Sequence, residues 1–272
     1  MKKLTESLVT LLTYVVAGLI FFPILWIILN AFKTENVAYQ FPPAFVFTPV
    51  LDQVIGAFGN GSYFLYLYNS LAVSVFSVIF VNILALPLAF YLAECEWYNK
   101  SSKLFGWILS TKFMPAVGIA VPIYIMLKDT GLLGTNFGLG IIYSAVSMPL
   151  IVLVMRSFFL DIPPAIIEAA SIDGASYWGI FLRVILPIST PGIATSTILA
   201  VIFNYNEYFF ATILSGPNSK TLSVYLSSFM TSEGLFWAKV SGISLLAILP
   251  ILVLGFLAQQ RIVRGLTLGA VK

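Results

Sequence analysis

Long segments without any charged residue constrain this chain more than any other feature of its sequence. They run over residues 7–32, 53–93, 113–127, 130–155, 184–206 and 240–260. About 20 apolar residues cross the hydrocarbon of a bilayer as a helix, whereas a single charge at its centre costs a few kcal/mol. The pattern therefore predicts an all-α, polytopic membrane protein with about six transmembrane helices.

The composition agrees with a lipid environment. Hydrophobic residues make up 60% of the chain and charged residues 9%, whereas soluble domains carry about 25% charged residues. The charged side chains, 14 Lys and Arg and 11 Asp and Glu, are too few to cover a water-exposed surface of this size. This excludes a soluble enzyme, a disordered chain and a nucleic-acid-binding protein.

Two residue types that carry chemistry are nearly absent. The chain has no histidine, and Cys95 is its only cysteine. Imidazole acid–base catalysis, an intrachain disulfide and a thiolate or histidine metal centre are therefore excluded. We expect neither a metal nor a cofactor.

We expect one membrane domain over residues 1–272. Its spans are predicted at about 7–32, 67–93, 104–127, 137–155, 188–214 and 240–260. The third span reaches its length only by admitting Lys112. A polar loop over 156–187 separates the fourth and fifth spans, and a tail over 261–272 follows the last.

The distribution of Lys and Arg predicts the orientation, because cytoplasmic loops are enriched in both. With a cytoplasmic N-terminus, the inner face holds Lys2, Lys3, Lys100, Lys103, Arg156, Arg183, Arg261, Arg264 and Lys272. The outer face then holds only Lys33, Lys128, Lys220 and Lys239. We therefore expect a multi-pass protein of the cytoplasmic (inner) membrane with both termini in the cytoplasm.

The loop between the fourth and fifth spans is predicted to contain a short helix. Asp161 is placed to cap its start, and a proline suits a first turn whose N–H groups are unpaired. Gly174 suits the left-handed residue that ends a helix, and Ser176 is placed to cap the next one. Ala165, Glu168, Ala169 and Ile172 share one face at helical spacing. From the residues alone, this is either an ordinary connector or a docking element.

Several motifs resemble those of one transporter family. They are Glu168-Ala169-Ala170 followed by Gly174 and Val184-Ile185-Leu186-Pro187, Asn69-Ser70-Leu71, Met114-Pro115, Asn206-Glu207-Tyr208, and the ending Arg264-Gly265-Leu266-Thr267 to Lys272. The chain is similar to permease subunits of binding-protein-dependent ABC importers, in the carbohydrate branch, where it resembles the MalG type. The resemblance implies the type I importer permease fold and a place as the second subunit of a heterodimeric pair.

The resemblance also implies which residues contact an ATP-binding subunit. The family's coupling helix matches Glu168, Ala169, Ala170, Asp173, Gly174, Leu186 and Pro187. Its C-terminal contact to the ATPases matches Arg264, Gly265, Thr267 and Lys272. In the family, ATP-driven closure of the ATPases is passed through the coupling helix to the membrane helices.

The chain has no phosphate-binding loop of its own, because the dipeptide Gly-Lys does not occur in it. We therefore expect it not to be an enzyme and ATP hydrolysis to take place on a separate subunit. The partners implied by the resemblance are a second permease, a dimer of ATP-binding subunits, an extracytoplasmic solute-binding protein and membrane lipid. The implied substrate is a sugar or oligosaccharide, and no nucleic acid is involved.

A tentative solute path is predicted in the fifth span. Asn204, Tyr205, Asn206 and Glu207 form the densest polar cluster in any predicted helix, and an intramembrane carboxylate points to function. Alternatively, Glu207 pairs with a group of a partner subunit or lies near the outer interface. Two other functions stay open: import of a solute other than a sugar, and ion-coupled secondary transport, which usually needs more intramembrane ionisable residues.

Overall fold

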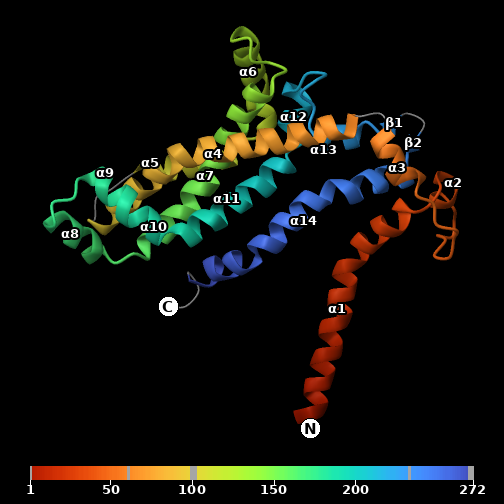
Figure 1. Ribbon diagram of the computed structural model, residues 1–272, viewed down its shortest axis with the longest axis horizontal. Coiled ribbons are helices and arrows are strands. Elements are labelled where there is room, and N and C mark those ends of the chain that lie inside the picture. The colour runs from red at the N-terminus through yellow and green to blue at the C-terminus, as the bar shows by residue number, and fades with distance from the viewer. Residues whose placement is uncertain (1, 60–61, 99–102, 232–233, 269–272) are drawn as a thin grey trace. The chain divides into compact units, whose positions relative to one another are not determined.

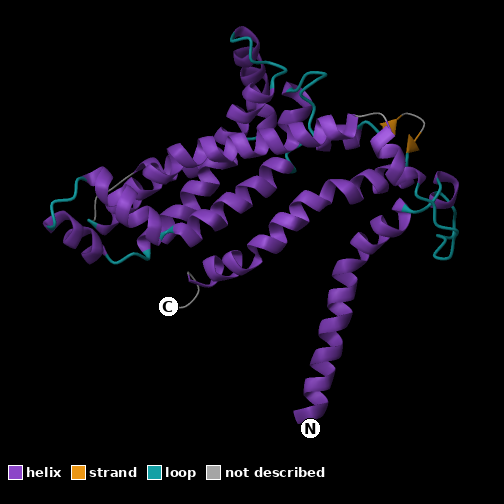
Figure 2. Ribbon diagram, in the orientation of Figure 1, coloured by secondary structure: helices purple, strands orange, loops and turns teal. Residues whose placement is uncertain are grey.

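The computed structural model describes residues 2–59, 62–98, 103–231 and 234–268, and most of these are helical (Figure 2). The strands in the described residues are β1 (Met230–Thr231) and β2 (Gly234–Leu235), which pair antiparallel. The predicted all-α class is therefore confirmed, with one two-residue ladder added. The chain divides into two compact units, residues 1–65 with 225–249 and residues 66–224 with 250–272.

The first unit contains the long N-terminal helix and the start of the C-terminal one. Its elements are α1 (Lys2–Ala31), α2 (Glu35–Ala38), α3 (Asp52–Gly59), the two strands and the first turns of α14 (Trp237–Leu268). The apolar window of α1 is wholly exposed, as expected of a helix whose solvent is lipid. The Glu35 carboxylate accepts from the amides of Ala238 (3.1 Å) and Lys239 (2.8 Å), which satisfies two free N–H groups at the start of α14.

The second unit holds most of the membrane bundle (Figure 1). Its elements are α4 (Ser62–Trp97, which begins in the first unit), α5 (Lys103–Ser110), the 3₁₀ turn η1 (Thr111–Phe113), α6 (Ala116–Asp129), α7 (Asn136–Leu160), α8 (Pro164–Ile172), α9 (Tyr177–Ile180), the π-helical η2 (Phe181–Ile185), α10 (Leu186–Ile188), α11 (Thr190–Tyr205), α12 (Phe209–Leu214) and α13 (Leu222–Ser227, which ends in the first unit).

The core of the second unit lies between α4, α7 and α11. Val81, Ile151 and Ala200, one from each helix, are almost fully buried in a single apolar cluster. The helices approach closely where side chains are small. A Cβ added to Gly140 of α7 would lie 2.4 Å from the ring of Phe76 on α4. Small residues at such contacts are typical of membrane helix packing, which depends on close van der Waals contact.

Four helices among the described residues are long and apolar enough to span a membrane, and six spans result if two bent pairs are counted. α1, α4, α7 and α14 contain nearly all of the first, second, fourth and sixth predicted spans. The limits of the spans in a bilayer stay predictions.

The third and fifth predicted spans are not continuous helices, contrary to expectation. α5 and η1 meet α6 at a bend of 96°. Pro115 has no N–H to donate and forces Met114 into the extended region (φ −69°, ψ 126°), so the helix ends there. The fifth span is interrupted at residues 206–208, between α11 and α12, and α11 is itself bent by 77° from the preceding segment Tyr177–Ile188.

Candidate functional site

The short helix α8 lies at one end of the second unit and exposes one face (Figure 1). Ile167 is buried against the apolar cluster, and Ala170 packs on the same cluster. Glu168 and Ala169 are exposed, and Ile172 is 87% exposed. The face predicted from helical spacing is therefore the outward one. An isoleucine held this far out of the core, beside a carboxylate and a small residue, is suited to contact with another protein.

Gly174 ends α8 as predicted, in the left-handed conformation (φ 81°). The amide of Gly174 donates to the carbonyl of Ser171 (3.1 Å), and the amide of Ala175 donates to that of Ala170 (3.0 Å). This pair of bonds is the Schellman motif, which satisfies the last carbonyls of a helix. A Cβ at Gly174 would meet no atom within 4 Å, so the backbone conformation alone favours glycine there.

The segment after Gly174 leads the chain from α8 back into the bundle. The Ser176 hydroxyl accepts from the amide of Gly179 (3.2 Å) and caps α9, as predicted. Leu186 packs on the buried cluster, whereas Pro187 is exposed. The predicted cap at Asp161 was wrong: Asp161 ends α7, and α8 begins after Pro163 without a side-chain cap. Pro164 removes one of the unpaired N–H groups in the first turn that a cap would otherwise satisfy.

Four aromatic side chains, from α4, α7, α9 and η2, pack together beside α8 and α9. The ring of Phe90 on α4 lies 5.9 Å from Phe159 of α7, 5.5 Å from Tyr177 of α9 and 5.4 Å from Phe181 of η2, measured between centroids. Beside them is a groove of about 430 Å³, with Glu94 of α4 and Ser171 of α8 in its wall. The rings connect α9 to α4, α7 and η2, and Ile167 of α8 belongs to the same apolar cluster.

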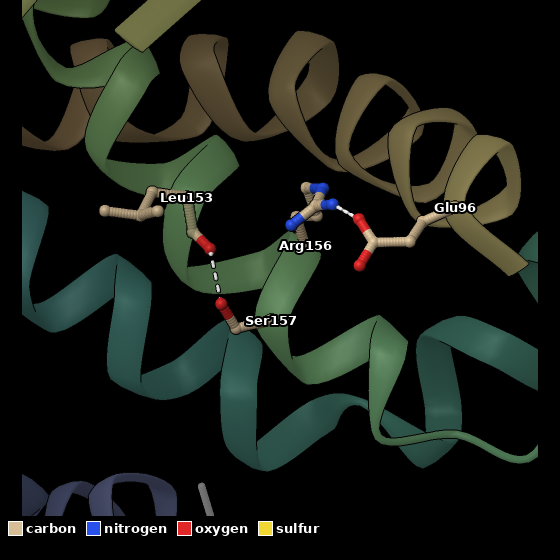
Figure 3. A network of polar contacts seen from close by, with 4 residues as sticks. All are labelled: Glu96, Leu153, Arg156 and Ser157. Carbon is tan, nitrogen blue, oxygen red and sulfur yellow. Dashed lines mark hydrogen bonds and ion pairs between the residues drawn. The ribbon is translucent and has the colours of Figure 1, made fainter. Parts of the chain in front are cut away.

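An ion pair joins two helices at this end of the unit. Arg156 of α7 forms an ion pair with Glu96 of α4 (Figure 3). Its guanidinium also lies 4.3 Å from the ring centroid of Phe105. The neighbouring Ser157 hydroxyl donates to the carbonyl of Leu153 (3.1 Å) and so stays within its own helix (Figure 3). From the sequence, Arg156 was used only to predict the orientation in the membrane. In the structure, its ion pair also holds α4 to α7.

Asn204, predicted on the solute path, is buried in a hydrogen-bond network between helices. Its Oδ1 accepts from the Ser147 hydroxyl of α7 (2.5 Å), and its Nδ2 donates to the Ser77 hydroxyl of α4 (2.7 Å). The Ser144 hydroxyl adds a contact to the Ser77 carbonyl (3.1 Å). Buried amides and hydroxyls of this kind hold membrane helices together.

Glu207 lies in the break between α11 and α12 and binds the start of α12. Its two carboxylate oxygens accept from the amides of Phe209, Phe210 and Ala211 at 2.9 to 3.3 Å. These amides have no partner within the helix, and the positive end of the helix dipole favours a carboxylate there. The backbone carbonyl of Glu207 also accepts from the hydroxyls of Tyr143 (3.2 Å) and Ser223 (2.9 Å). Glu207 therefore has a structural partner within its own chain.

The other members of the polar cluster differ in exposure. Tyr205 is buried, whereas Asn206 is exposed. The Asn206 amide nitrogen donates to the carbonyl of Ile202 (2.8 Å), one turn earlier in its own helix. Asn206 thus differs from its neighbours in the polar cluster, because its side chain is accessible from outside the chain.

The predicted C-terminal contact residues are described only in part. Arg264, Gly265 and Thr267 lie in the last turns of α14, where the structure describes the backbone but not the side chains. Lys272 lies outside the described residues. Among the residues that are described, no three His, Cys, Asp or Glu side chains gather where a metal ion could bind.

Asn69 has a structural role that residue patterns alone did not reveal. Its Nδ2 donates to the carbonyls of Asn218 (2.9 Å) and Lys220 (3.0 Å), and its Oδ1 accepts from the Asn136 amide (2.8 Å). The next residue, Ser70, accepts from the amide of Leu222 (2.7 Å). The available sequence signal was the pair of adjacent polar residues Asn69 and Ser70 at the start of an apolar run. In the structure, these two residues hold the loop after α12 against α4.

Comparison with known proteins places this geometry in a family. The sequence model of the family described as "Binding-protein-dependent transport system inner membrane component" matches residues 54–262, more than half of the chain. The diacetylchitobiose uptake system permease protein DasC of Streptomyces coelicolor is 30% identical over 94% of this chain and 92% of its own length. The trehalose transport system permease protein SugB of Mycobacterium tuberculosis is 30% identical over 94% of each chain.

A solved structure has the same fold. It is a chain of a bacterial ABC transporter involved in the import of the acidic polysaccharide alginate, which superimposes with a TM-score of 0.75 and is 23% identical. The match covers 95% of this chain and 96% of that one. The predicted importer permease fold is therefore confirmed.

Proposed function

This chain belongs to the family of inner membrane components of binding-protein-dependent transport systems, and we propose that it is a permease subunit of an ATP-driven sugar importer. Membership of a transporter family means that the chain is not itself an enzyme. The sugar class follows from relatives named for diacetylchitobiose and trehalose uptake, both over most of their length. ATP hydrolysis then takes place on a separate subunit.

The exposed face of α8 is the observation that carries the proposal. Within the described part of the chain, no hydrogen bond or ion pair holds the Glu168 carboxylate. The same face presents Ala169 and the 87% exposed Ile172, while Ile167 anchors the opposite face. A helix that is fixed on one side and exposes a free charge and an apolar side chain on the other is suited to a cleft in a partner.

The residues of this region take distinct roles in the proposal. Glu168 pairs with a basic side chain of the ATPase, and Ala169 permits its close approach, whereas Ala170 supports α8 from the inner side. Asp173 and Gly174 set the angle at which α8 meets α9, and Leu186 and Pro187 pass movement into α11. Arg264, Gly265, Thr267 and Lys272 form a second contact with the ATPases.

The other partners and the location are part of the same proposal. A second permease forms the translocation path together with this chain, and an extracytoplasmic binding protein delivers the sugar. The complex lies in the inner membrane with both termini of this chain in the cytoplasm. This orientation puts α8 on the side where ATP is available.

Asn206 is the member of the fifth-span cluster best suited to contact the solute. Its side chain is exposed, although its amide donates to the Ile202 carbonyl of its own helix, whereas Asn204 and Tyr205 are buried and the Glu207 carboxylate binds the start of α12. In this proposal, Asn204, Tyr205 and Glu207 shape the path and hold its wall.

The proposal is tested by purifying the chain from its native membrane with its associated proteins. We expect a complex that contains a second permease and two ATP-binding subunits. Its ATPase activity should rise when one binding protein loaded with one sugar is added. The charge-reversed variant Glu168→Lys should lose the ATPases from the complex, whereas Asp129→Lys, which reverses an exposed charge at the end of α6, should retain them.

Two results would contradict the proposal. The first is a stable complex that contains no ATPase. The second is sugar uptake in proteoliposomes that persists without ATP and stops when the proton or sodium gradient is dissipated, which would establish the secondary transporter instead.

A further inference from the structure

A cavity of about 420 Å³ lies in the second unit where the third span is broken. Its wall is mostly apolar and comes from α5, η1, α6, α7 and α12. The residues that matter for the argument are Trp107, Thr111, Lys112, Met114 and Phe210. A largely apolar cavity with a few polar groups is the usual form of a small-molecule site.

Both interrupted helices contribute to this one cavity. Thr111, Lys112 and Met114 lie at the break around Met114-Pro115, and Phe210 lies in the first turn of α12, after the break at residues 206–208. Irregular backbone at membrane depth is tolerated where protein buries it or where it lines a water-filled cavity. In secondary transporters, discontinuous helices form the solute site. By analogy, a cavity lined by two interrupted helices is a candidate place for a translocated solute.

Lys112 is an exposed cation in the wall of this cavity. Within the described residues it forms neither an ion pair nor a hydrogen bond through its side chain. The Glu207 carboxylate, which is next to Phe210 in the second break, is already occupied by four contacts with amides of α12. An exposed ammonium on the wall of a mostly apolar cavity is accessible to an anion supplied from outside the chain, and such an anion would lower the cost of a charge in a predicted membrane segment.

We propose that this cavity binds the anionic group of the transported sugar, a carboxylate, sulfonate or phosphate, on the ammonium of Lys112. The proposal rests on the proposed function as a sugar importer and specifies its substrate class. The ammonium offers three donors to the oxygens of the anion. The Thr111 hydroxyl, which donates to the Ile108 carbonyl (2.7 Å), keeps its lone pairs for a sugar hydroxyl. Trp107 and Phe210 offer ring faces to the C–H groups of the sugar.

The test uses the complete importer with its binding protein in liposomes of phosphatidylcholine and phosphatidylethanolamine, which carry no net charge. Uptake is measured for matched pairs of labelled sugars: disaccharides that end in a hexose or in the corresponding hexuronate, and hexoses with or without a phosphate or sulfonate. We expect the transported sugars to be anionic. Lys112→Gln should lower their uptake about tenfold or more, because a charged hydrogen bond is lost.

Two variants control for folding and for general loss of charge. Lys112→Arg keeps the cation and should retain most of the uptake. Lys128→Gln removes a lysine near the end of α6 that does not line the cavity, and should transport as the wild type does. Sugar-independent ATPase activity should be the same in all of these complexes.

Three outcomes would overturn the inference and leave the importer intact. One is ATP-driven uptake of neutral sugars only. Another is uptake of anionic sugars at the wild-type rate by Lys112→Gln. The third is a defect of Lys112→Gln that appears only when phosphatidylglycerol is added, which would assign Lys112 to a lipid phosphate. Failure to obtain ATP-driven transport of any sugar would instead contradict the proposed function itself.

Discussion

At the scale of single residues, polar side chains in the second unit bond to one another before they are available to a solute. Asn204 was predicted on a solute path because it lies in a dense polar cluster. In the fold it bridges Ser77 of α4 and Ser147 of α7. A buried amide in an apolar bundle costs free energy unless its hydrogen bonds are made, so these partners decide its role in folding.

We expect Asn204→Leu to destabilise the purified protein by about 1–2 kcal/mol, because two interhelical hydrogen bonds are lost and two serines lose a partner. Unfolding in sodium dodecyl sulfate micelles measures this change. Asn206→Leu is the matched control, since the Asn206 amide bonds only within its own helix, and it should alter stability by less than about 0.5 kcal/mol. Equal destabilisation by both variants would show that the network does not hold α11 in place.

At the scale of elements, α8 owes its direction to how it ends. The left-handed residue at Gly174 reverses the chain within two residues, and Ser176 starts the next helix at once. With Ile167 buried on one side, α8 keeps its Glu168 face outward. A connector without this turn would leave the direction of α8 undefined.

Gly174→Val should uncouple ATP hydrolysis from uptake or prevent assembly with the ATPases. A β-branched residue in the left-handed region costs about 1–2 kcal/mol, so the chain would leave that conformation and turn α8 away. The measurement is the number of sugar molecules imported per ATP hydrolysed in proteoliposomes.

Gly174→Asn is the matched variant, because asparagine tolerates the left-handed conformation and no atom lies within 4 Å of the new Cβ. It should keep most of the coupling. Wild-type coupling in Gly174→Val would refute the docking role of the turn. A loss in Gly174→Asn as severe as in Gly174→Val would show that size, rather than backbone conformation, matters at this position.

At the scale of the whole molecule, α7 sets the distance between the two ends of the second unit. Its 25 residues extend over about 37 Å at 1.5 Å per residue, enough to cross a hydrocarbon layer of about 30 Å. Asn136, at the start of α7, bonds to Asn69, and Asn69 in turn holds the loop at Lys220. The last turn of α7 leads into α8. Lys220 is therefore held near the start of α7, whereas Ile172 follows its end, so the two residues mark opposite ends of this helix.

In a chain with Cys95→Ser, we expect Lys220→Cys to react with a membrane-impermeant maleimide in intact cells. Ile172→Cys should react only in inside-out vesicles washed with urea to remove the ATPases. Both positions are exposed, so access depends on the side of the membrane and not on burial. Labelling of Ile172→Cys from outside intact cells would reverse the proposed orientation.

The class of protein, the apolar segments and the end of α8 at Gly174 were predictable from the sequence, whereas the predicted cap at the start of α8 was wrong. These features depend on local quantities: the cost of a charge in lipid, the need of a chain end for a cap, and the freedom of glycine at Gly174. The family also followed from local motifs, because Glu168 and Gly174 lie close together in the chain at a spacing that the sequence shows directly.

Only the tertiary structure decided which polar residues face one another. The breaks at Met114-Pro115 and at residues 206–208 lie far apart in the sequence, and only folding brings Lys112 and Phe210 to one cavity. Likewise, Asn204 joins three helices, although a linear pattern shows it only as a polar residue in an apolar run. The physical reason is that the free energy of a buried polar group depends on its neighbours in space, whereas the cost of placing a segment in lipid depends on that segment alone.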